Sequence, residues 1–191
     1  MASSFDADAF REFERQGHDR LADSYTDLFT PITGLAIDSL LDAGRIEAGS
    51  KVLDVASGPG LVCGAVRDPG GHPTGVDLSS RMVERARQLY PGIAFQVGDV
   101  ERLPLADASF NAVVSNFGLG HFPRPEASVV ECVRVLRPGG MLAFSWWDTL
   151  EKQRLQAIFR EAITASGAKP GPSIPTGHDV FRFSNTQARP A

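Results

Sequence analysis

Short apolar runs alternate with amphipathic segments between residues 51 and 165, and this alternation constrains the fold more than any other feature. The runs are four or five residues long, which is the length of a buried strand rather than of a helix. Strands that are apolar throughout and joined by helices form parallel sheets covered on both faces. The sequence therefore predicts a doubly wound (Rossmann-like) α/β fold with a mainly parallel sheet, whose strands are expected at residues 51–55, 74–77, 93–97, 110–114 and 141–144.

The chain divides into three expected parts that together form one compact domain. Residues 1–45 form an N-terminal helical cap of two or three helices. Residues 46–166 form the α/β core, and residues 167–191 form a tail rich in glycine and proline, which is typical of loops. In the cap, one helical face is marked by apolar spacing at Leu21, Tyr25, Leu28 and Phe29.

Composition argues against several classes of protein. The 191 residues carry 19 basic and 23 acidic side chains without a run of lysine or arginine, so a nucleic-acid partner is not expected. No apolar run approaches the roughly 18 residues of a membrane-spanning helix, and the N-terminus lacks the pattern of a signal peptide. The cysteines and histidines show neither a disulfide framework nor the spacing of metal ligands. We therefore expect a cytoplasmic protein without a membrane span or a metal site.

Glycines and polar residues that suit a nucleoside ligand stand at the carboxyl ends of four predicted strands. The first strand runs into the segment 54–60, whose glycines allow a tight turn and a close approach to a ligand. The second ends at Asp77, a carboxylate suited to ribose hydroxyls; the third ends at Asp99 and the fourth at Asn116. Because ligands of open parallel sheets bind beyond the strand ends, we expect one shared crevice there.

Each of these features has a simpler explanation when it stands alone. Gly58 and Gly60 also suit an ordinary strand-to-helix turn, and Asp77 also suits the cap of the helix after it. A dinucleotide site usually has the pattern G-x-G-x-x-G, but Gly64 comes one residue too late for it. Neither tyrosine is followed four residues later by lysine, as a short-chain dehydrogenase requires. A nicotinamide oxidoreductase is therefore the weaker interpretation.

Four segments together resemble the class I S-adenosylmethionine-dependent methyltransferases. They are residues 52–60 (VLDVASGPG), 75–79 (GVDLS), 98–104 (GDVERLP) and 136–140 (LRPGG), in the family's order and spacing. The resemblance covers about residues 51–147 and is strongest to the small-molecule branch that contains the ubiquinone/menaquinone C-methyltransferases. It implies S-adenosylmethionine as cofactor, S-adenosylhomocysteine as product, and a small-molecule O, C or N acceptor.

The resemblance also implies roles for individual residues. Asp77 is expected to hold the ribose hydroxyls, and Asp99 the amine of the adenine. Ala56 stands where the family most often has glycine, which narrows the loop. The other expected cofactor contacts are Asp54, Ser57, Gly58 and Gly60 beside the methionine part, Leu78 and Met82 near the adenine, Gly98 and Val100 next to Asp99, Asn116 and Phe117 toward the acceptor, and Tyr25 from the cap.

His121 is the catalytic candidate, because it follows the fourth strand and is expected beside the transferred methyl group. A histidine can take a proton from a hydroxyl acceptor near neutral pH. The alternative is that His121 only packs or binds a backbone carbonyl. Methyl transfer depends chiefly on holding donor and acceptor in line, so a base is not obligatory, and both roles stay open.

The C-terminal part of the sequence is short for the family's full fold, which adds two edge strands. Residues 168–191 hold one strand-like piece, at 180–183, and no room for a complete pair. We therefore expect the C-terminal edge strands to be missing, and the exposed sheet edge then favours a homodimer. The alternative to a working methyltransferase is a non-catalytic or truncated domain of the same kind that binds the nucleoside.

Overall fold

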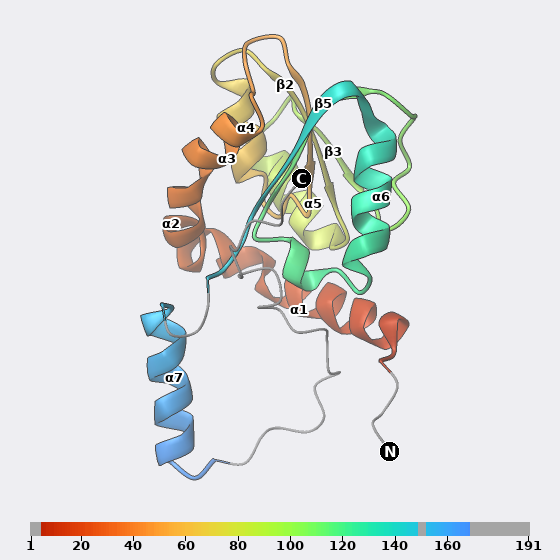
Figure 1. The fold of residues 1–191 in the computed structure, drawn as a ribbon. Helices are drawn as coiled ribbons and strands as arrows, with labels where there is room; N and C mark the ends of the chain where they lie inside the picture. The colour runs from red at the N-terminus through yellow and green to blue at the C-terminus, as the bar shows by residue number, and fades with distance from the viewer. Residues whose placement is uncertain (1–4, 149–151, 169–191) are drawn as a thin grey trace, which may run out of the picture.

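The computed structural model describes residues 5–148 and 152–168 (Figure 1). Five parallel strands form one sheet in the order β3-β2-β1-β4-β5. The chain order reverses between β1 and β4, which makes their carboxyl ends the place for a ligand. The predicted doubly wound parallel sheet is confirmed, with strands β1 (Lys51–Val55), β2 (His72–Asp77), β3 (Ala94–Val97), β4 (Phe110–Asn116) and β5 (Leu136–Ser145).

Helices cover both faces of the sheet. On one face, Val52 and Val114 pack in a buried cluster with α3 (Ile37–Ala43) and α4 (Leu61–Arg67). The neighbouring residues Leu53 and Val113 point to the other face and pack with Cys132 and Val135 of α6 (Pro125–Val135). Successive strand residues thus alternate between two cores, as the pleat of a strand requires. The helix α5 (Ser80–Leu89) packs on β3, and the side chain of Ser79 caps its N-terminus by accepting from the backbone N–H of Met82.

The N-terminal part of the chain begins with one long helix. The helix α1 (Ala7–Leu28) has 22 residues, Gly17 does not interrupt it, and it contains Leu21, Tyr25 and Leu28 of the predicted apolar face. It is followed by the short α2 (Thr30–Thr33) and η1 (Gly34–Ala36). In Figure 1, α1 crosses below the sheet at the carboxyl ends of the strands. Among the described residues, no helix has the length and apolar character needed to cross a membrane.

The edge strand β5 starts five residues earlier than the sequence predicts. The helix α6 ends at Val135, and Leu136 already pairs with Phe110 of β4. The register of the two strands then shifts, because Ala112 of β4 pairs with Met141, and Gly139 and Gly140 lie in this irregular stretch of β5. Within the described residues β5 is paired on one side only, and the helix α7 (Arg154–Ala165) follows it. The strand-like piece at 180–183 lies outside the described residues.

Candidate active site

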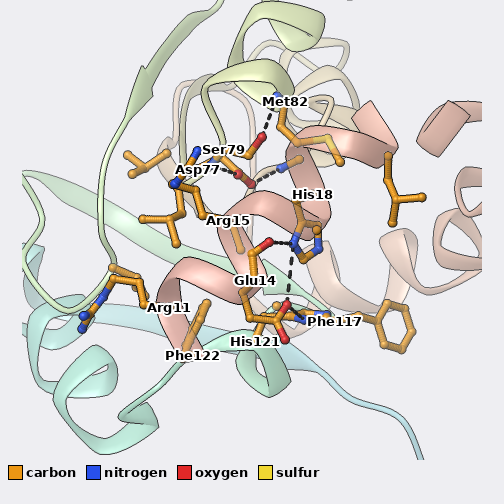
Figure 2. Close-up of a pocket in the computed structure, with 18 of the residues that line it drawn as sticks. Arg11, Glu14, Arg15, His18, Asp77, Ser79, Met82, Phe117, His121 and Phe122 are labelled. Carbon is orange, nitrogen blue, oxygen red and sulfur yellow. Dashed lines mark hydrogen bonds and ion pairs between the residues drawn. The ribbon is translucent and has the colours of Figure 1, made fainter. Parts of the chain in front are cut away.

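A cavity of about 440 Å³ lies between α1 and the carboxyl ends of the strands (Figure 2). Its volume is in the range of small-molecule sites, and it adjoins the point where the strand order reverses. Most residues singled out from the sequence come together here, although they are far apart in the chain. Those that line it are Tyr25, Ala56, Gly58, Asp77, Leu78, Met82, Gly98, Asp99, Val100, Asn116, Phe117 and His121.

The turn after β1 forms one wall of this cavity. Ala56, Gly58 and Gly60 all have positive φ angles, of 55°, 51° and 89°. Ala56 is accommodated because Gly118 lies beside it: a Cβ on residue 118 would stand 2.8 Å from the Ala56 Cβ. Gly60 does not line the cavity. A Cβ there would stand 2.7 Å from Cζ of Phe95, so this glycine permits the close packing of the turn.

Asp77 joins the turn after β1 to the end of β2. Its carboxylate accepts hydrogen bonds from the backbone N–H of Gly58 at 2.7 Å and of Ser79 at 2.8 Å. Burial raises the pKa of this carboxyl, although the two backbone donors oppose the shift. A carboxylate has about four lone-pair positions, so two remain for further donors from the cavity. The position and chemistry of Asp77 fit the two hydroxyls of a ribose.

Asp54 and Ser57 line a small neighbouring cavity of about 30 Å³ instead of the main one. Asp54 is 1% exposed, and burial raises its pKa to about 8, with the charge of Asp77 adding to the shift. Cys63 Sγ donates to Asp54 Oδ2 at 3.6 Å, while Asp54 Oδ1 and Ser57 Oγ have no hydrogen-bond partner among the described residues. Such orphaned buried oxygens fit a ligand that brings hydrogen-bond donors, as the amine of the expected cofactor does.

Asp99 is engaged by the cap. Its Oδ2 lies 2.7 Å from Nε of Arg11 on α1, and its Oδ1 accepts from the backbone N–H of Glu101 at 2.9 Å. Glu101, whose side chain is 5% exposed, also pairs with Arg11 and Arg124 at 2.7 Å each. A base amine that reaches Asp99 must therefore share this carboxylate with Arg11. The ion pairs of Arg11 with Asp99 and Glu101 hold α1 over the adenine end of the expected site.

The end of β4 forms the wall nearest β5. Asn116 is held by its neighbours: its amide Nδ2 donates to Thr33 O at 3.0 Å, and its Oδ1 accepts from Ser145 Oγ at 2.6 Å. Phe117 has a φ of 59°, and its ring stacks on Trp147 with centroids 4.2 Å apart. A non-glycine residue in this conformation is costly and is frequent at binding sites. Phe117 and Trp147 thus give this end of the cavity an aromatic wall.

A polar cluster on α1 meets the catalytic candidate. His121 Nδ1 lies 2.8 Å from Glu14 Oε2, and the His18 ring meets the His121 ring edge to face with centroids 4.9 Å apart. Each of Glu14, His18 and His121 offers a ligand atom within 4.8 Å of the others, a grouping that could hold a metal ion. The chain spacing, which suggested no metal site, does not reveal this grouping because His121 comes from a distant segment.

Several residues of α1 that line the cavity are not singled out by the sequence. Arg11, Glu14 and His18 line it together with Leu21 and Tyr25, which the sequence does single out. Their spacing of three or four residues is helical, but they alternate cation, anion, imidazole and apolar side chains. A search for apolar periodicity finds Leu21 and Tyr25 but not the polar residues of this face. The signal that could have found it is the helical spacing of side chains that bind ligands.

The sequence and the fold are similar to those of proteins of known family. Residues 53–144 match the family model described as Methyltransferase domain. A demethylmenaquinone methyltransferase of Beutenbergia cavernae is 36% identical over 166 residues, which are 83% of this chain and 69% of the relative. A malonyl-[acyl-carrier protein] O-methyltransferase of Erwinia billingiae is 35% identical over 145 residues, 76% of this chain and 57% of that one. The chain thus spans only part of these relatives.

Solved structures agree with these matches. An S-adenosylmethionine-dependent methyltransferase from Mesorhizobium loti superposes with a TM-score of 0.51 at 27% identity, over 58% of this chain and 51% of that one. A structure from Methanococcus maripaludis gives a TM-score of 0.59 over 81% of this chain and 73% of that one. At 22% identity, the second supports the fold alone.

Proposed function

We propose, since this chain belongs to the class I S-adenosylmethionine-dependent methyltransferase family, that it binds S-adenosylmethionine and transfers the methyl group to a small-molecule O, C or N acceptor. The observation that carries this proposal is Asp77, a buried carboxylate at the end of β2 that faces the cavity with acceptor capacity left over. The matches favour neither a nicotinamide oxidoreductase nor a binding domain without activity.

The proposed cofactor contacts follow the length of the cavity. Asp77 accepts from the ribose hydroxyls, while Leu78 and Met82 pack against the adenine and Asp99, between Gly98 and Val100, accepts from its amine. At the methionine end, Asp54 and Ser57 offer their orphaned oxygens, and the Tyr25 hydroxyl comes from α1. Ala56, Gly58 and Asn116 shape the wall, and Gly60 supports the turn from behind.

When bound, the cofactor supplies an electrophilic methyl group on a positively charged sulfur. The protein's own part is to hold the acceptor in line with that group and to keep water away. The helix α1 covers the cavity, and the stacked pair of Phe117 and Trp147 bounds the acceptor side. We assign His121 the role of taking a proton from an acceptor that carries one.

Two further expectations stay with this proposal. We place the protein in a reducing cytosol, because Cys63 and Cys132 are both free and buried rather than joined. We also propose a homodimer through β5, whose outer edge has no partner strand among the described residues. Sedimentation at increasing concentration tests the dimer, and a monomer at every concentration would contradict it.

Transfer itself is tested with a cofactor that carries a deuterated methyl group. The protein is incubated with this donor and with phenolic, quinol, amine and carboxylate acceptors, and the products are weighed by mass spectrometry. The proposal predicts the added deuterated methyl group on at least one acceptor class. Binding of the cofactor with no transfer to any class would support the non-catalytic alternative instead.

A further inference from the structure

We infer that Glu14 is a positioning residue that fixes the proton of His121 on Nδ1, so that Nε2 is the atom that accepts a proton from the acceptor. This inference rests on the proposed function and extends it, because it assigns a role to a residue of the cap helix. It also selects the acceptor class. A base at this place serves an acceptor that must lose a proton from oxygen, such as a phenol or an enol.

The contact between the two residues is direct. His121 Nδ1 and Glu14 Oε2 are 2.8 Å apart, although the residues are 107 positions apart in the chain. A carboxylate only accepts hydrogen bonds, so the proton between them belongs to Nδ1 when the imidazole is neutral. The hydrogen bond of one ring nitrogen decides which nitrogen is protonated. Nε2 is then left with its lone pair.

The surroundings hold both side chains in place. The Glu14 side chain is only 16% exposed, and His121 lines the cavity at 47% exposed. The edge-to-face contact with the His18 ring, at 89° between the planes, restricts rotation of the His121 ring (Figure 2). His18 is fixed in turn, because its Nδ1 lies 2.8 Å from the backbone oxygen of Glu14. The dyad is therefore oriented from α1.

The charges nearby leave the Glu14 carboxylate available to His121. Arg11 pairs with Asp8, Asp99 and Glu101, and Arg15 pairs with Glu12 and Asp19. His18 is the other titratable group in direct contact with Glu14, and Asp77 interacts with both histidines through its charge. A protonated His121 can thus form an ion pair with Glu14.

The proton and the electrons balance in the step that this dyad serves. The acceptor's O–H bond breaks, and its proton passes to Nε2 of His121. The oxygen's electron pair forms the new bond to the methyl carbon, and the pair of the broken carbon–sulfur bond stays on sulfur, which loses its positive charge. The imidazolium is paired with Glu14 until its proton passes to water.

A metal ion held by the same three residues is the competing explanation of the cluster. In the structure, however, Nδ1 of each histidine is already engaged, that of His121 by the Glu14 carboxylate and that of His18 by a backbone oxygen. The observed contacts are those of a hydrogen-bonded dyad with a third ring packed against it. We therefore favour the dyad, and the experiment below includes the metal as an outcome.

The first test determines which ring nitrogen of His121 carries the proton. Two-dimensional 15N NMR of the imidazoles, at a pH of about 8.5 where an ordinary imidazole is neutral, distinguishes the two tautomers. We expect His121 as the Nδ1–H form in the wild type and a shift toward the Nε2–H form in Glu14→Ala. Glu12→Gln, on the same helix but outside the cavity lining, is the matched control and leaves the spectrum unchanged. An identical His121 pattern in Glu14→Ala overturns the inference.

The second test is kinetic and uses an acceptor found to be methylated. Glu14→Ala is expected to lower kcat about 10- to 100-fold with little change in the KM for the cofactor. Glu14→Gln, which can still accept through its amide oxygen, is expected to lose less, and Glu14→Asp to recover part of the rate. Activity that falls with a chelator and returns with a divalent metal would overturn the dyad. If no acceptor is methylated, the NMR result still decides the inference while the proposed function fails.

Discussion

The carboxylate of Asp77 accepts the backbone N–H of Gly58 at 2.7 Å and so ties the end of β2 to the turn after β1. The bond thus joins the ends of the neighbouring strands β2 and β1, on one side of the point where the strand order reverses. The bond holds the buried carboxylate and the glycine-containing turn beside the same cavity. The pair therefore defines where the ribose and the methionine part of the cofactor meet in our account.

Asp99 is predicted to recognise the exocyclic amine of adenine. S-inosylhomocysteine carries a carbonyl oxygen in place of that amine, so it should bind the wild type at least tenfold more weakly than S-adenosylhomocysteine, a loss of about 1.4 kcal/mol or more. In Asp99→Ala this preference should shrink or reverse, because Arg11 next to it can donate to a carbonyl. Calorimetry with both ligands measures the preference, and an unchanged ratio in the variant would rule out this role.

His121 is predicted to act on the acceptor rather than on the cofactor. His121→Ala should reduce kcat by about 100-fold or more for an acceptor that loses a proton, because the proton acceptor is gone. Its affinity for S-adenosylhomocysteine should stay within twofold of the wild type, about 0.4 kcal/mol. His72→Ala at the start of β2, away from the cavity, is the control. Unchanged turnover in His121→Ala would leave this side chain with a packing role.

Asp54 is predicted to make the protein less stable as the pH rises. Burial raises its pKa to about 8 in the folded state, from 3.8 for a free side chain. The folded state thus holds the proton more tightly, and the free energy of unfolding falls as the pH rises between about 4 and 8. Asp54→Asn cannot ionise, so its decline should be shallower.

Urea denaturation at several pH values tests this prediction. Asp77, whose pKa is also raised by burial, contributes in the same direction and remains in the Asp54→Asn variant, so part of the slope should persist. Asp42→Asn on the exposed side of α3 is the control and should follow the wild type. Parallel curves for the wild type and Asp54→Asn would mean that Asp54 is ionised in the folded protein.

Alanine substitution at two glycines is predicted to change the free energy of unfolding in opposite directions. Gly60→Ala places a Cβ 2.7 Å from Phe95 at a φ of 89°, which should destabilise the fold by about 2 to 4 kcal/mol. Gly17→Ala lies inside α1 with nothing within 4 Å of the new Cβ, so it should stabilise by about 0.5 to 1 kcal/mol. Thermal and urea denaturation measure both changes. A tolerated Gly60→Ala would remove the packing role assigned to this glycine.

The central part of the fold follows from the sequence because its signal is local. Strands such as β1 and β4 are mostly apolar, and polar residues at or next to their carboxyl ends, Asp54 and Asn116, mark the strand ends as the site. Asp77 and Asp99 could be placed at one crevice since parallel strands end on the same edge of a sheet. The start of β5 could not be predicted. The register with β4 shifts between Phe110 and Ala112, and residues that elsewhere form turns belong to the strand here.

The polar face of the cap could not be predicted for a different reason. Glu14 and His18 meet His121 only because α1 is one continuous helix laid across the strand ends. The packing of a helix against a distant loop is set by tertiary contacts such as the bond from Ser79 Oγ to Asp19 at 2.6 Å. Such contacts leave no periodic pattern in the sequence. The separate small cavity at Asp54 depends on packing in the same way.

Calorimetric titration with S-adenosylmethionine and S-adenosylhomocysteine, in the wild type and in Asp77→Asn, tests whether the cavity binds this cofactor through Asp77. We predict one site for both ligands in the wild type. The variant, which loses the charge that strengthens the ribose hydrogen bonds, should bind both about 10- to 100-fold more weakly, or about 1.5 to 3 kcal/mol. Asp107→Asn, an exposed carboxylate outside the cavity lining, should bind as the wild type does. Absence of binding to either ligand in the wild type, or binding of NADH in their place, would contradict the account.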